Sequence, residues 1–153
     1  KMSIKKKKII YVLAAVLGVF LFAQLFRPQK NTYQQIPKTD ISKVEEVPVK
    51  VASILKTSCY DCHSNNTNYP WYQNITPVNY YLAEHINDGK KHLNFSEWEN
   101  LSTSKKHHAL KEILEEIEAK KMPLKSYLLL HQQAKLSATD IETLKNWIDK
   151  NLN

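Results

Sequence analysis

The stretch Cys59-Tyr60-Asp61-Cys62-His63 decides how the rest of the sequence is interpreted. It contains both cysteines of the chain, three positions apart, and a histidine follows the second one directly. Residues three apart on a helical turn lie on the same side, so the two sulfur atoms face one direction. The next imidazole can turn toward the same space. The stretch therefore predicts a compact group of two thiols and one imidazole.

The C-x-x-C-H pattern indicates covalent attachment of one haem. Cys59 and Cys62 are then expected to form thioethers with its two vinyl groups, and His63 to be the proximal axial ligand of the iron. Two alternatives stay open. The cysteines could form a disulfide or a thioredoxin-type redox pair, although no βαβ pattern surrounds them. They could also bind zinc with two histidines, although His107 and His108 are adjacent instead of three to five positions apart.

A haem iron has a sixth position, and the residue that fills it separates electron transfer from gas or peroxide chemistry. Met122 is the one methionine after Met2, and Pro123 follows it in a segment between two predicted helices. We therefore predict Met122 as the distal ligand, although a single methionine also serves as core filler. Trp71 is a candidate haem contact through its ring or its N–H group. That Trp71 is an ordinary surface aromatic residue is almost as well supported.

The remaining pattern favours an all-α fold. The chain has only two glycines, which argues against a phosphate-binding glycine loop and against a turn-rich β architecture. Apolar residues recur at helical spacing in several segments, and capping residues or prolines mark their ends. The predicted helices run from Pro48 to Cys59, from Thr76 to Asp88 with Gly89 as the stop, from Thr103 to Lys120, and onward from a capping box of Ser137 and Asp140.

The first 26 residues predict a membrane anchor. Residues 9–26 are an apolar run of 18 residues that follows four consecutive lysines. As a helix the run would span about 27 Å, close to the roughly 30 Å of a bilayer core. Since no clear small-x-small cleavage site follows, we predict an uncleaved transmembrane signal anchor. The membrane is thus the predicted partner, and the predicted location is the bacterial inner membrane, single-pass, with the haem domain in the periplasm.

The same pattern divides the chain. We predict a cytoplasmic basic segment over residues 1–8, the anchor over 9–26, a tether over 27–47 and a c-type haem-binding domain over 48–152. The formal charge of +7 comes from the start of the chain, because residues 1–30 hold seven basic residues and no acidic one. The remainder has 15 basic and 15 acidic residues. No nucleic-acid partner is expected.

Four stretches resemble the bacterial haem-binding domain family of single-haem, c-type cytochrome-like proteins. The resemblance implies covalent haem c, His63 as proximal ligand and, by likeness to the Met-Pro loop of class I cytochromes c, Met122 as distal ligand. It also implies a cytochrome c-like, small all-helical domain around one haem, here preceded by the predicted transmembrane helix. The matching stretches are Cys59-Tyr60-Asp61-Cys62-His63-Ser64-Asn65, Tyr69-Pro70-Trp71-Tyr72, Lys91-His92-Leu93-Asn94-Phe95-Ser96-Glu97-Trp98 and Met122-Pro123-Leu124-Lys125-Ser126-Tyr127.

The leading functional hypothesis is a membrane-anchored one-electron carrier in the periplasm with a His/Met-ligated haem, and not an enzyme. Its redox partners cannot be inferred from the sequence. The alternative is a five-coordinate haem that acts as a sensor or has peroxidase-like activity. A third hypothesis is an assembly protein in which the haem is incidental.

Overall fold

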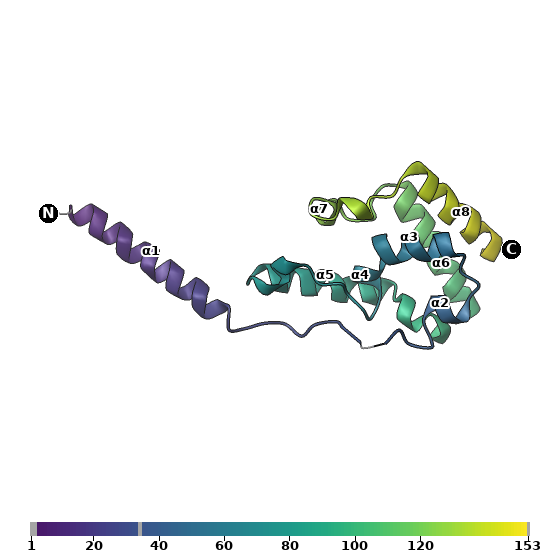
Figure 1. Ribbon diagram of the computed structural model, residues 1–153, viewed down its shortest axis with the longest axis horizontal. Coiled ribbons are helices and arrows are strands. Elements are labelled where there is room, and N and C mark those ends of the chain that lie inside the picture. The colour runs from purple at the N-terminus through teal and green to yellow at the C-terminus, as the bar shows by residue number, and fades with distance from the viewer. Residues whose placement is uncertain (1–2, 34, 153) are drawn as a thin grey trace. The chain divides into compact units, whose positions relative to one another are not determined.

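The computed structural model describes residues 3–33 and 35–152. This described part is helical and contains no strand of a sheet, apart from an isolated bridge between Thr32 and Asn66 (Figure 1). The predicted all-α class is therefore confirmed. In chain order the elements are α1 (Ile4–Ala23), α2 (Ile41–Val44), α3 (Val49–Ser58), α4 (Tyr60–His63), η1 (Trp71–Asn74), α5 (Val78–His92), η2 (Phe95–Asn100), α6 (Thr103–Glu118), α7 (Lys125–Leu128), η3 (Gln132–Ala134) and α8 (Ala138–Leu152).

The prediction of a transmembrane anchor over residues 9–26 is wrong, because no helix within the described residues is long and apolar enough to cross a membrane. Helix α1 begins at Ile4, directly before the four lysines, and ends at Ala23. Its uncharged part, from Ile9 onward, has 15 residues and spans only about 22 Å at ~1.5 Å per residue. The membrane partner and the inner-membrane, periplasmic location rested on this anchor, and both are corrected with it.

Helix α1 ends where the hydrogen-bonding pattern changes. The backbone N–H groups of Gln24, Leu25 and Phe26 each donate to the carbonyl three residues earlier, which tightens the last turn. The side chain of Gln24 pairs with the backbone of Thr76, donating to its carbonyl at 3.1 Å and accepting from its N–H at 2.9 Å. The hydropathy of the run could not reveal this end, because a polar amide and a distant backbone group produce it.

The described chain forms two compact units. The first comprises the residues up to Lys30 together with Tyr69–His85, and the second comprises Asn31–Asn68 together with the residues from Ile86 onward. The first unit contains α1, η1 and the start of α5. The second contains the end of α5 and all the other helices. The domain boundaries proposed from the sequence stay a prediction.

Helices α3, α6 and α8 form the core of the second unit, with α8 in contact with both of the others (Figure 1). Each helix turns one apolar stripe inward, as the 3.6-residue period requires. The capping box expected before α8 is present, because Ser137 Oγ donates to Asp140 Oδ2 and accepts from the Asp140 N–H. The buried stripes are Val51, Ile54 and Leu55 on α3, Leu110, Ile113 and Ile117 on α6, and Leu144, Trp147 and Ile148 on α8.

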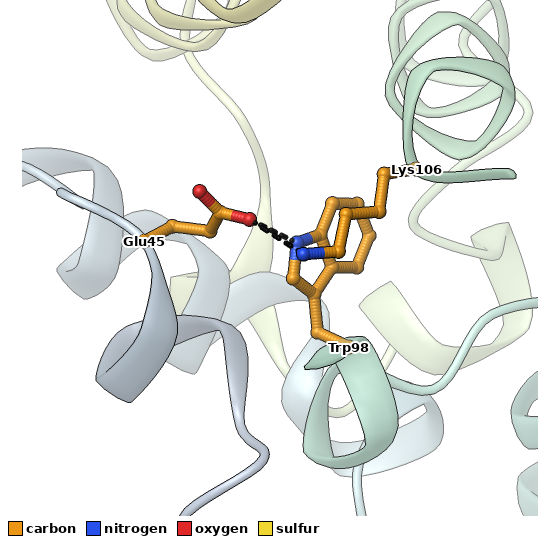
Figure 2. Close-up of polar contacts among 3 residues, drawn as sticks. All are labelled: Glu45, Trp98 and Lys106. Atoms are coloured by element: carbon orange, nitrogen blue, oxygen red, sulfur yellow. Dashed lines mark hydrogen bonds and ion pairs between the residues drawn. The ribbon is translucent and has the colours of Figure 1, made fainter. Parts of the chain in front are cut away.

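The segment before α3 also contributes to this core. Asp40 and Ile41, at the start of α2, are fully buried. Glu45, just after α2, accepts hydrogen bonds at one carboxylate oxygen from Trp98 Nε1 and from Lys106 Nζ, both at 3.0 Å (Figure 2). These contacts fasten residues 40–45 to η2 and α6.

Candidate functional site

The predicted group of thiols and imidazole lies on one turn. Cys59 follows the last residue of α3, and α4 then carries Cys62 and His63. The Cys59 carbonyl accepts from the N–H groups of Cys62 at 3.2 Å and His63 at 3.0 Å, which closes the turn. Both cysteines are half-buried and free of any disulfide. The chain thus presents two unbonded thiols and an imidazole within five residues.

Burial keeps both thiols protonated. It raises the pKa of Cys59 to about 12, with a smaller contribution from Cys62. It raises the pKa of Cys62 to about 11, with a smaller contribution from the carboxylate of Asp61. Redox-active C-x-x-C pairs depend on a lowered pKa, because the thiolate is the attacking species. The surroundings of these cysteines have the opposite effect, so they do not favour the thioredoxin-type alternative.

The side chain of His63 is held in one tautomer. Its Nδ1 lies 3.1 Å from the carbonyl oxygen of Leu93. A carbonyl can only accept, so Nδ1 carries the proton and Nε2 keeps its lone pair. Burial, the largest contribution, lowers the pKa of His63 and favours the neutral ring. A neutral imidazole oriented by a backbone carbonyl through its other nitrogen is the usual state of a metal-binding histidine.

Gly89 explains how α5 comes so close to this turn. The expectation that Gly89 stops the helix is wrong, because α5 continues to His92. A Cβ atom at this position would lie 2.9 Å from the Cys62 carbonyl oxygen and 3.3 Å from the Cys62 Cβ. Only a residue without a side chain permits this approach. The approach brings the end of α5, and the Leu93 carbonyl just beyond it, up to His63.

The Lys91–Trp98 stretch, for which the sequence suggested no chemical role, packs against the turn that carries the cysteines and the residues just after it. The ring of Phe95 stacks on Tyr60 with centroids 5.3 Å apart. Asn94 donates to the side-chain oxygen of Asn65 at 3.1 Å, and Ser96 Oγ accepts from the Asn65 N–H at 3.0 Å. The two stretches singled out by resemblance therefore pack against each other, which is a contact that their separate positions in the sequence could not indicate.

A buried carboxylate supports the turn from another direction. The hydroxyl group of Tyr60 donates to Asp40 Oδ1 at 2.9 Å, and Ser42 donates to the same oxygen through its N–H and its hydroxyl group. Burial, with the neighbouring Asp40 carboxylate, raises the pKa of Tyr60 and keeps its hydroxyl protonated. Sequence reasoning missed Asp40, since an isolated aspartate in a polar segment gives no signal of burial.

Met122 is held at the end of α6. It is half-buried and packs against the same hydrophobic core as Cys59. Helix α6 ends in a Schellman turn: Lys120 has the left-handed φ of 54°, the Lys120 N–H donates to Ile117, and the Lys121 N–H donates to Glu116. The Met122 N–H also donates to the Glu116 carbonyl, at 3.2 Å. The position of Met122 thus follows from the helix end. Its role as distal ligand stays a prediction.

Trp71 belongs to a different compact unit from the turn and Met122. It starts η1, within the other compact unit, and its side chain is 75% exposed. Its ring meets that of Tyr72 edge to face, with centroids 5.9 Å apart. Its contact with haem stays a prediction.

The zinc alternative finds no support in the geometry. Among the described residues, no group of three or more histidine, cysteine, aspartate or glutamate side chains is arranged to hold a metal ion. His85 and His92 each pair through Nδ1 with a backbone carbonyl one turn earlier on α5. His108 lies 3.4 Å from Glu112 on α6. The donor set at the turn instead suits a cofactor that brings its own equatorial ligands.

The fold and this turn define an all-α protein that carries a C-x-x-C-H site. The model of the haem-binding domain family matches residues 18–150, and the chain belongs to this family. It is accordingly a haem-binding protein. Comparisons with curated proteins and with solved structures found no match.

Proposed function

We propose that the chain holds one haem c through thioethers at Cys59 and Cys62, with His63 and Met122 as axial ligands, and that it carries single electrons. Haem iron supplies the ferrous–ferric couple. The observation that carries the proposal is the hydrogen bond from His63 Nδ1 to the Leu93 carbonyl, on the turn that also bears both thiols. It supports Nε2 of His63 as the iron ligand.

The chain's own residues orient the imidazole and stiffen the turn that carries it. Gly89 and Leu93 hold the imidazole in place, and the stacked rings of Tyr60 and Phe95 keep the turn rigid. A rigid site with two protein ligands favours electron transfer over substrate binding. A thioether ligand at Met122 would also favour the reduced state and raise the potential.

Covalent attachment is tested by an intact mass and a pyridine haemochrome spectrum on the full chain, produced in a host able to mature haem c. We expect the mass of one added haem and the spectrum of two thioether bonds. Cys59→Ser or Cys62→Ser should shift the spectrum toward a single thioether. Colourless protein from that host would contradict the proposal.

Distal ligation is tested separately, with carbon monoxide and ferric absorption. His/Met ligation predicts slow, weak binding of carbon monoxide to the ferrous protein and a weak far-red ferric band that Met122→Ala removes. Rapid binding to the wild-type protein, unchanged by Met122→Ala, would favour the five-coordinate alternative of a sensor or peroxidase-like protein.

A further inference from the structure

Asp61, between the two cysteines, uses its carboxylate to reach a distant part of the chain. Its Oδ2 accepts a hydrogen bond from the hydroxyl group of Tyr127 at 2.7 Å, across 66 residues of sequence. Its Oδ1 accepts from the Asn68 N–H at 3.0 Å, and its backbone carbonyl accepts from Thr67 Oγ1 at 2.7 Å. The carboxylate is therefore fixed in place by the loop that follows the turn.

Tyr127 lies on α7, five residues after Met122. Its ring stacks on His131 with centroids 4.1 Å apart and planes at 7°, which restricts the side chain. Before Met122 the chain is fixed by the hydrogen bond from the Lys121 N–H to the Glu116 carbonyl. Beyond Met122 it is fixed by the hydrogen bond from the Tyr127 hydroxyl group to Asp61. Met122 thus lies between two fixed points.

Burial contributes little to holding this segment. Helix α7, described over its whole length, has no fully buried side chain. Leu129 and Leu130, directly after it, are 75% and 66% exposed. A short hydrogen bond to a carboxylate is among the stronger polar contacts of a protein, so it weighs heavily where packing is weak.

We propose that the Asp61–Tyr127 hydrogen bond is a latch that holds the Met122 segment against the cysteine-bearing turn. Asp61 and Tyr127 are then positioning residues for the distal ligand. This inference rests on the proposed His/Met ligation. Without the latch, the segment after Met122 moves more freely and the Met122 sulfur leaves the iron more often.

The test is carbon monoxide binding to the ferrous, haem-loaded full chain carrying Tyr127→Phe. A hydrogen bond to a charged acceptor corresponds to roughly a ten- to hundredfold change in an equilibrium, so carbon monoxide affinity should rise by about that factor. The far-red ferric band should weaken in parallel. Asp61→Ala should act like Tyr127→Phe, and the double variant should be no worse than either. Asp61→Asn loses the charge and offers one acceptor oxygen to two donors, the Tyr127 hydroxyl group and the Asn68 N–H, so it should raise the affinity by less than Asp61→Ala does.

Glu45→Ala is the matched control for a general loss of stability. It removes a carboxylate that accepts a long-range hydrogen bond from Trp98 elsewhere in the same unit (Figure 2). It should lower stability without raising carbon monoxide affinity. If Met122→Ala raises this affinity and Tyr127→Phe does not, the latch is refuted while His/Met ligation stands. If neither Met122→Ala nor Tyr127→Phe changes it, the ligation itself fails.

Discussion

Replacement of Gly89 by alanine tests how the end of α5 is placed against the turn that carries Cys59, Cys62 and His63. A Cβ atom there would lie 2.9 Å from the Cys62 carbonyl oxygen, 3.3 Å from the Cys62 Cβ and 3.4 Å from its carbonyl carbon. The nearest atom belongs to the backbone of a hydrogen-bonded turn and cannot rotate away. Helix α5 must therefore move, and the Leu93 carbonyl that orients His63 moves with it.

Two opposed effects set the change in the free energy of unfolding caused by Gly89→Ala. Alanine favours a helix over glycine by up to about 1 kcal/mol. Overpacking a close contact typically costs about 1–3 kcal/mol, and contact with backbone places this site toward the upper end. We expect a net loss of about 1–2 kcal/mol in the free energy of unfolding of the haem-loaded protein. Urea titration followed by haem absorbance measures it, and a pyridine haemochrome assay should show less haem per chain.

Gly18→Ala is the control, because Gly18 is the chain's other glycine and a Cβ there meets nothing within 4 Å. It should cause no destabilisation and no loss of haem. A Gly89→Ala protein as stable as the wild type, with full haem content, would refute the reasoning about the close approach.

Substitutions at three further positions test local features, each by urea titration. Glu45→Ala should lower the free energy of unfolding by about 1–3 kcal/mol, because it leaves the buried Trp98 N–H without an acceptor. Glu45→Gln should lower it by less, since this variant loses only the charge near Lys106. Lys120→Gly should stabilise the protein by about 1 kcal/mol, because it relieves a left-handed residue at φ 54°; no gain would argue against the Schellman turn. Asp140→Asn should destabilise the protein at neutral pH, and the difference from the wild type should vanish in acid. The hydrogen bonds with Ser137 lower the pKa of Asp140. The contribution of the Asp140 carboxylate to stability is therefore present above the unfolded-state pKa and is lost as pH falls through the folded-state pKa. A difference that persists in acid would contradict this.

Local spacing made part of the structure predictable. The helical class, the stripes of α3, α6 and α8, and the capping box before α8 depend on residues within one or two turns of each other. The haem-binding identity followed from five consecutive residues for the same reason. The errors arose at helix ends. Helix α1 starts and stops at places that the hydropathy of residues 9–26 does not mark, and α6 ends at Glu118 in a Schellman turn that no glycine announces.

By itself, the sequence determined that two thiols and an imidazole share one turn of a helical protein, because covalent spacing along a helix fixes their directions. Only the tertiary structure decided what surrounds that turn. Along the sequence, the Leu93 carbonyl, Gly89 and Tyr127 are 27 to 66 residues from the groups they contact. Such contacts depend on how helices pack, and packing depends on the whole set of buried side chains, which no local pattern encodes.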